Sequence, residues 1–122
     1  EEYIAFADKY FQKSTYKKKI KQHIGNALDI LPEIKEKIQL VFIDADKENY
    51  SNYYNLVFDK LEVGGYIIAD NVLWSGKVVE DKMDEETKAL VDYSTLINED
   101  KRVENVLLPV RDGLMICRKI SE

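Results

Sequence analysis

Two apolar runs, each followed by polar side chains, decide the fold of this chain. The first run reads Leu40-Val41-Phe42-Ile43-Asp44-Ala45-Asp46-Lys47, and the second reads Gly65-Tyr66-Ile67-Ile68-Ala69-Asp70-Asn71. A short continuous apolar run is typical of a strand that is buried in a parallel sheet. Each run therefore predicts a buried strand that delivers acidic side chains to its carboxyl end.

The polar residues after the two predicted strands carry oxygen atoms that suit a hard divalent cation. Neighbouring parallel strands lie about 4.8 Å apart, so Asp44 and Asp70 could converge on one ion, with the amide oxygen of Asn71 beside them. Such ligands favour magnesium, calcium or manganese over zinc. Open α/β sheets also bind ligands beyond the carboxyl ends of their strands. The alternative is that either acid only caps the helix that follows its strand.

Composition limits the classes of function. The length of 122 residues suits one domain with a core, and the net charge of -5 argues against a nucleic-acid surface. The single cysteine, Cys117, lies in an apolar run and is typical of a buried strand residue in a reducing compartment. No apolar stretch reaches the roughly 20 residues of a membrane helix. We therefore expect a cytoplasmic protein without nucleic-acid or membrane partners.

Hydrophobic periodicity and turn residues predict alternating helices and strands. Helical spacing begins at Tyr3, and Pro32 is expected to end or restart a short helix. The arrangement predicts a mostly parallel sheet with an antiparallel edge. The expected elements are a helix from Tyr3 to Phe11, a strand Ile20–Ile24, a helix Ala27–Leu31, a strand Ile38–Ile43, a helix Lys47–Leu61, a turn at Val63–Gly65, a strand Tyr66–Ala69, a loop Val72–Asp81, a helix Met83–Ile97, and the strands Val103–Val110 and Leu114–Ile120 joined by a hairpin.

Four segments carry a resemblance to a known family. They are Gly25-Asn26-Ala27, residues 42–47, residues 64–74 and residues 109–114. Together, over about residues 3–119, they resemble the C-terminal half of the cation-dependent O-methyltransferases that use S-adenosylmethionine, the group of the catechol and caffeoyl-coenzyme A enzymes and their bacterial relatives. The resemblance implies an α/β fold with a Rossmann-like class I methyltransferase sheet, mostly parallel with an antiparallel C-terminal hairpin, and without its N-terminal strands.

The resemblance also implies a metal and acceptor site. Asp44, Asp70 and Asn71 would hold Mg²⁺, or Ca²⁺ or Mn²⁺ in its place. Lys47 would assist deprotonation of the acceptor hydroxyl, and Trp74 would wall the pocket of a hydroxylated aromatic small molecule. Each role has a plainer alternative, because Lys47 could be the first exposed residue of its helix and Trp74 could be a hydrophobic plug.

The methyl-donor site is implied by the same resemblance. Gly25, Ala27, Asp44 and Asp46 would bind S-adenosylmethionine, and family members commonly form homodimers. The N-terminal half of the family's domain, with its first strand and Gly-rich turn, has no counterpart here, so we expect residues 1–122 to form one partial domain. In the family's strand order, Ile20–Ile24 would then lack an adjacent strand.

Three hypotheses follow from the sequence. The first is a metal-assisted O-methyltransferase that acts on a catechol-like or phenolic hydroxyl. The second is a catalytically incomplete fragment that serves as a binding or assembly module. The third is an unrelated acid-rich α/β domain, such as a phosphoacceptor receiver, in which Asp44 would be modified; the residues before Ile38 do not supply the acidic pair that a receiver needs.

Overall fold

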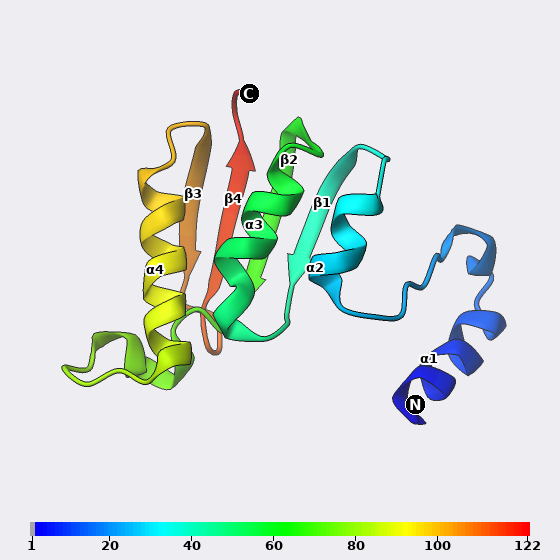
Figure 1. Cartoon of the computed structure of the whole chain (residues 1–122), viewed down its shortest axis with the longest axis horizontal. Helices are drawn as coiled ribbons and strands as arrows, with labels where there is room; N and C mark the ends of the chain where they lie inside the picture. Colours follow the sequence, from blue (N-terminus) through cyan, green and yellow to red (C-terminus); the bar gives the residue numbers. More distant parts are fainter. Residues whose placement is uncertain (1) are drawn as a thin grey trace.

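The computed structural model describes residues 2–122. Four strands form one sheet in the order β1-β2-β4-β3, and helices α3 and α4 pack on the same face of it (Figure 1). The elements are α1 (Glu2–Lys13), a 3-10 turn η1 (Lys17–Lys19), α2 (Ala27–Ile30), η2 (Leu31–Glu33), β1 (Ile38–Ile43), η3 (Lys47–Asn49), α3 (Tyr50–Phe58), β2 (Leu61–Asp70), η4 (Trp74–Val79), α4 (Glu85–Glu99), β3 (Val103–Leu108) and β4 (Leu114–Lys119).

The sheet is mixed, as the expected fold class requires. β1 and β2 are parallel, with Ile43 opposite Ala69, whereas β4 runs antiparallel to both β2 and β3. The predicted strand Ile38–Ile43 and the C-terminal hairpin are confirmed. The parallel part of the sheet is smaller than expected, since one of the three strand pairs in the described residues is parallel.

Two local expectations were wrong, and one predicted helix is present but shorter than expected. Ile20–Ile24 forms no strand, because no neighbouring strand supplies hydrogen-bond partners for its backbone. The helix predicted over Lys47–Leu61 ends at Phe58 and begins with the 3-10 turn η3. The predicted turn at Val63–Gly65 lies inside β2, where a Cβ on Gly65 would stand 3.0 Å from the carbonyl oxygen of Gln39. Glycine at position 65 thus allows the two parallel strands to approach closely.

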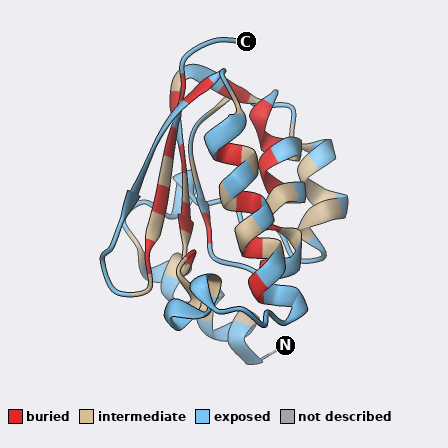
Figure 2. Cartoon of the chain, turned by 90° about the vertical axis from the view of Figure 1, so that its left-hand side faces the viewer, coloured by how far each residue is buried: buried red, intermediate tan, exposed pale blue. Residues whose placement is uncertain are grey.

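The core lies between the sheet and helices α3 and α4 (Figure 2). Aromatic residues of α3 and aliphatic residues of α4 meet the inward side chains of β1, β2 and β4. α4 begins at the N-cap Asp84, whose carboxylate accepts a hydrogen bond from the Thr87 N–H at 2.8 Å. Fully buried members include Tyr50, Tyr54, Leu61, Ile67, Ala69, Leu90, Tyr93, Ile97 and Cys117. Within residues 2–122, no helix has both the length and the apolar character needed to cross a membrane.

The other face of the sheet is exposed. Leu40 and Phe42 on β1 are 60% and 58% exposed, and Tyr66 on β2 and Val106 on β3 are exposed as well. Helix α1 has no buried residue and lies beyond the β1 edge of the sheet (Figure 1). The apolar side chains that alternate with the core side chains therefore meet solvent in this chain.

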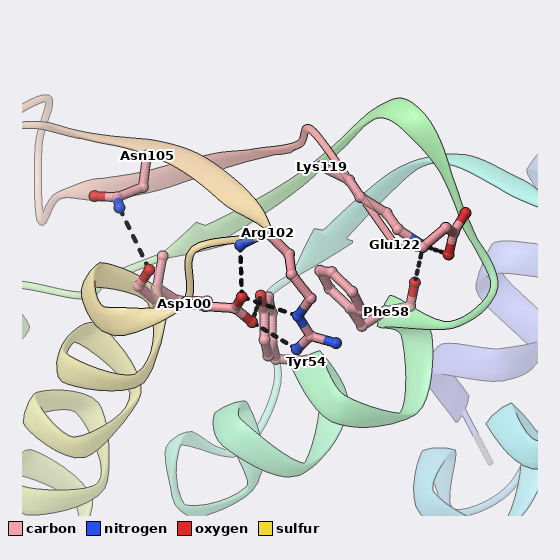
Figure 3. A network of polar contacts seen from close by, with 8 residues as sticks. Tyr54, Phe58, Asp100, Arg102, Asn105, Lys119 and Glu122 are labelled. Atoms are coloured by element: carbon pink, nitrogen blue, oxygen red, sulfur yellow. Dashed lines mark hydrogen bonds and ion pairs between the residues drawn. The ribbon is translucent and has the colours of Figure 1, made fainter.

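A polar network ties the end of α4 to α3 (Figure 3). The Asp100 carboxylate accepts hydrogen bonds from the Tyr54 hydroxyl at 2.9 Å and from the Arg102 guanidinium at 2.9 and 2.7 Å. These bonds hold the pKa of Asp100 well below its usual range, and the bond from Arg102 has the largest effect. The guanidinium also lies 3.9 Å from the centroid of the Phe58 ring.

The Asp100 network predicts a pH effect on stability. The folded-state pKa of Asp100 is lowered, so the ionised carboxylate adds to the free energy of unfolding. This contribution is complete above the unfolded-state pKa of about 3.9 and is lost as pH falls below that value. Asp100→Asn should lower the free energy of unfolding at neutral pH. Between about pH 6 and about pH 3, this variant should lose less of its free energy of unfolding than the unaltered chain does. Urea midpoints measured at both pH values check this, with exposed Asp92→Asn as the control. Equal losses in the Asp100 variant and the unaltered chain would contradict it.

Candidate active site

The ends of β1 and β2 bring three of the predicted site residues together. Asp44 follows β1, and Asn71 follows β2, on adjacent parallel strands. The Nζ atom of Lys47 lies 3.5 Å from Asp44 Oδ1 and 3.1 Å from Asn71 Oδ1. Asp70, the last residue of β2, accepts the N–H of Asn71 on its own Oδ1 at 2.7 Å. We call Asp44, Lys47, Asp70 and Asn71 the strand-end cluster: Lys47 contacts Asp44 and Asn71, and the Asp70 carboxylate contacts the N–H of Asn71.

Lys47 is buried, although lysine is usually exposed. Its side chain is 7% exposed, whereas that of Asp44 is 58% exposed. The amine donates to the Tyr50 hydroxyl at 2.5 Å, in addition to its two oxygen partners in the cluster. The alternative that Lys47 is merely the first exposed residue of its helix is therefore wrong. A buried amine with three oxygen partners has a defined position.

Tyr50 is a member of the site that the sequence did not single out. Its side chain is fully buried, and its hydroxyl donates to the Asp70 carbonyl oxygen at 2.9 Å while accepting from Lys47. Burial raises the pKa of Tyr50, so the hydroxyl keeps its proton at neutral pH. Tyr50 lies in the helix predicted over Lys47–Leu61, and hydrophobic spacing does not distinguish it from any other core residue of that helix. The signal that could have found it is the spacing of three residues after Lys47, which places both on one helical face.

The turn after β2 is fixed by the hairpin between β3 and β4. The N–H groups of Val72 and Leu73 donate to the carbonyl oxygens of Gly113 and Asp112 at 3.2 and 2.9 Å. Gly113 has φ +84°, and a Cβ at this position would lie 2.5 Å from Leu73 Cγ. Asn71 adopts φ +61°, a conformation that asparagine tolerates better than most residues. The hairpin therefore sets the direction in which the Asn71 side chain leaves the sheet.

Trp74 lies beside the buried amine. The centroid of its ring is 5.5 Å from Lys47 Nζ and 5.9 Å from Lys77 Nζ. The indole is half-buried, and its Nε1 has no hydrogen-bond partner among residues 2–122. Trp74 thus borders the strand-end cluster.

Asp46 belongs to a separate hydrogen-bonded group. Its carboxylate accepts from the Tyr53 hydroxyl at 2.5 Å and from the side-chain amide of Asn49. The Tyr53 bond is the main cause that lowers the pKa of Asp46, while burial and the neighbouring carboxylate raise the pKa of Tyr53 to about 12. Asp46 is therefore a fixed anion at the same end of the sheet.

An apolar hollow of about 210 Å³ lies next to the end of β1. Ala27 and Asp44, two of the predicted donor-site residues, line it together with Phe42 and Tyr53. Its further lining residues are Leu31, Val41, Ile43, Ala45 and Val57. Gly25 and Asp46 do not line the hollow. Gly25 precedes the N-cap Asn26, whose side chain accepts from the Leu28 N–H at 2.9 Å and so starts α2 above the hollow.

The donor set of the cluster fits a hard cation with open coordination positions. Asp44 and Asp70 offer carboxylate oxygens, and Asn71 offers an amide oxygen. Among residues 2–122 no group of three or more histidine, cysteine, aspartate or glutamate side chains could enclose a metal. Magnesium is typically held by one or two carboxylates and completes its shell with water and substrate oxygens. The cluster matches that pattern better than it matches a closed structural site.

Comparison with known proteins identifies the family. Residues 1–120 match the sequence profile of a family described as O-methyltransferase. The chain is 40% identical over 110 residues to caffeoyl-CoA O-methyltransferase 1 of Arabidopsis thaliana, covering 80% of this chain and 42% of the relative. It is 36% identical over 122 residues to caffeoyl-CoA O-methyltransferase 1 of Eucalyptus globulus, covering 90% of this chain and 50% of the relative.

Solved structures show the same fold. An SAH-bound methyltransferase of Podospora anserina superposes with a TM-score of 0.85 at 27% identity, covering 97% of this chain and 56% of that one. An O-methyltransferase of Bacillus cereus in complex with SAH gives 0.73 at 28% identity, covering 80% and 49%. The chain spans about half the length of the curated relatives it matches. Since the family profile covers nearly the whole chain, this protein belongs to the O-methyltransferase family.

Proposed function

We propose that this chain is the metal-binding and acceptor-binding part of an S-adenosylmethionine-dependent O-methyltransferase that acts on a catechol-like or phenolic hydroxyl. In this proposal residues 1–122 form one partial domain. The observation that carries it is the buried Lys47 amine, held 3.5 Å from Asp44 Oδ1 and 3.1 Å from Asn71 Oδ1 at the ends of two parallel strands. The names of the relatives support O-methylation as the reaction.

The strand-end cluster supplies charge where an acceptor hydroxyl would lose its proton. A divalent ion held by Asp44, Asp70 and Asn71 would lower the pKa of a hydroxyl bound to it. Lys47 would stabilise the resulting oxyanion through its ammonium group, at a fixed position from which water is largely excluded. Preorganised charge of this kind needs little rearrangement when the reaction occurs.

Trp74 and the apolar hollow would position the two reactants. The indole face suits a flat aromatic ring, because aromatic pairs prefer stacked or edge-to-face contact. Ala27 and Asp44 would line the donor side, with Gly25 and Asp46 near it, and the donor's sulfonium would supply the methyl group. The remaining contribution of the chain is orientation, which governs an in-line displacement.

The proposal includes a metal cofactor, an oligomeric state and a cellular location, which the family resemblance implies. They are magnesium, with calcium or manganese as substitutes, a homodimer, and a cytoplasmic location.

The acceptor half of the proposal is tested by calorimetric titration of 3,4-dihydroxybenzoate into the chain, with Mg²⁺ and with EDTA. We expect binding with Mg²⁺ that EDTA weakens by about tenfold or more, because two vicinal oxygens can chelate the ion. The matched control ligand, 4-hydroxybenzoate, lacks the second oxygen and should show little dependence on Mg²⁺. Equal binding of the diol with Mg²⁺ and EDTA would refute metal-assisted recognition.

The donor half is tested by titrating S-adenosylhomocysteine into the same sample. A measurable heat of binding would support a methyl-donor site around Ala27 and Asp44. No binding at millimolar concentration contradicts this part of the proposal for the chain by itself.

A further inference from the structure

The hydroxyl of Tyr50 joins the ends of both parallel strands to the buried amine. It donates to the carbonyl oxygen of Asp70, the last residue of β2, at 2.9 Å. The carbonyl oxygen of Ile43, the last residue of β1, lies 3.5 Å away, and Lys47 Nζ donates to the hydroxyl at 2.5 Å. One buried oxygen thus contacts the two backbone positions that carry the strand-end cluster and the amine between them.

We propose that Tyr50 is a positioning residue: its hydroxyl limits how closely the Lys47 amine approaches the oxygens of Asp44 and Asn71, and it fixes the strand end that carries Asp70. The proposal rests on the proposed function for the roles of Lys47 and the metal ligands. Tyr50 itself touches neither of the reacting groups in this account. It acts through the position of the amine and through the backbone of Asp70.

The hydroxyl of Tyr50 differs from that of its neighbour Tyr93. The two rings pack edge to face with centroids 5.5 Å apart, and both side chains are fully buried. The Tyr93 hydroxyl has no hydrogen-bond partner among residues 2–122, whereas the Tyr50 hydroxyl has a donor and an acceptor. Ring packing alone would be served as well by phenylalanine at position 50. The contacts of its hydroxyl therefore point to a role that packing does not explain.

The lengths of the amine's contacts indicate how the Tyr50 hydroxyl would affect cation binding. Lys47 Nζ is 2.5 Å from the Tyr50 oxygen, closer than its 3.1 Å from Asn71 Oδ1 and 3.5 Å from Asp44 Oδ1. Without the hydroxyl, the ammonium should move toward the two cluster oxygens, since they would be its remaining partners. There it would compete with a divalent cation for the same ligands.

Tyr50→Phe tests the proposal, with Tyr93→Phe as the matched control that removes a hydroxyl without a partner from the same core. Mn²⁺ is titrated calorimetrically into each variant and into the unaltered chain. We expect Tyr50→Phe to weaken Mn²⁺ binding by about tenfold, the effect typical of groups that orient ligands, and Tyr93→Phe to leave it within about twofold. A loss of thermal stability with unchanged Mn²⁺ affinity would show a structural role alone and overturn the proposal.

A second measurement reports the amine directly, without any metal. In chain carrying ¹³C-labelled lysine, the two Hε protons of Lys47 should give separate NMR signals, because the side chain is held in one position. These signals should merge toward a free-lysine average in Tyr50→Phe and stay separate in Tyr93→Phe. Unchanged Lys47 signals in Tyr50→Phe would overturn the proposal.

The two measurements separate this proposal from the proposed function. If the unaltered chain binds no Mn²⁺, the metal part of the proposed function fails, and the Lys47 signals decide the role of Tyr50. If Tyr50→Phe does not fold, the unaltered chain supplies the test: the Tyr50 hydroxyl proton should exchange slowly and show a nuclear Overhauser effect to the Lys47 Hε protons. Absence of that contact would contradict the proposal.

Discussion

Asp70→Asn is expected to weaken divalent-cation binding by at least about tenfold, because it removes one of the two carboxylates of the strand-end cluster. Asparagine keeps the shape of the side chain and an oxygen that can accept the Asn71 N–H, which Asp70 Oδ1 now accepts at 2.7 Å. The substitution therefore removes charge with little change in the turn. Mn²⁺ titration by calorimetry at neutral pH measures the effect.

Asp112 provides the matched control for this substitution. It lies in the hairpin beside the turn after β2, and its Oδ1 accepts the Ser75 N–H at 2.5 Å. Asp112→Asn removes the same charge close to the site and keeps the acceptor oxygen. We expect its Mn²⁺ affinity to stay within about threefold of the unaltered chain, an effect of general electrostatics alone. Equal losses in both variants would mean that Asp70 is not a ligand.

Lys119→Met should destabilise the fold by about 3 kcal/mol, since it leaves two buried carbonyl oxygens without their donor. The Lys119 side chain is fully buried, and its amine donates to the carbonyl oxygen of Phe58, the last residue of α3, at 3.2 Å (Figure 3). The amine also donates to the carbonyl oxygen of Leu61, the first residue of β2, at 3.0 Å. It also pairs with Glu122 at 2.8 Å. Methionine fills a similar volume, so the expected loss comes mainly from the unsatisfied carbonyl groups.

Urea unfolding at neutral pH measures the Lys119 effect through the free energy of unfolding. Lys88→Met, an exposed substitution on α4, controls for the removal of a lysine charge and should change stability by less than about 0.5 kcal/mol. Buried ion pairs can often be replaced by apolar residues without loss, but the acceptors here are backbone oxygens that the substitution cannot remove. If Lys119→Met shifts the urea midpoint no more than Lys88→Met does, the Lys119 amine does not stabilise the fold through these carbonyl oxygens.

Elements with strong local signals could be predicted from the sequence. Strand β1 matches the predicted Ile38–Ile43, and the N-cap Asp84 and the turn at Arg111–Gly113 bound elements close to the expected positions. Pro32 divides a short helix into α2 and η2, as its missing N–H requires. These features depend on periodicity and turn chemistry within a few residues.

Features that depend on distant partners could not be predicted in this way. Ile20–Ile24 has the composition of a strand, but a strand forms only where another one pairs with it. Leu61 continues the helical spacing of α3, yet it begins β2, because Ile38 pairs with it and Lys119 binds its carbonyl oxygen. Local pattern carries no information about these long-range contacts.

The meeting of side chains at the strand ends was predictable from the sequence, whereas the contacts of Tyr50 were not. Asp44, Lys47 and Asn71 come together because parallel strands end at one edge of the sheet, a rule that the sequence pattern could apply. Tyr50 escaped notice because hydrophobic spacing treats tyrosine and phenylalanine alike. Only the folded structure shows that its hydroxyl binds Lys47, while that of Tyr93 has no partner in the described residues.

Whether the ends of β1 and β2 form a divalent-cation site is tested most directly by paramagnetic NMR on ¹⁵N-labelled chain with substoichiometric Mn²⁺. We expect Mn²⁺ to broaden first the backbone amide signals of Asp44 to Lys47 and of Asp70 to Val72, and excess Mg²⁺ to restore them. Broadening that spares both segments, or that begins at other acidic residues such as those of α4, would contradict the claim.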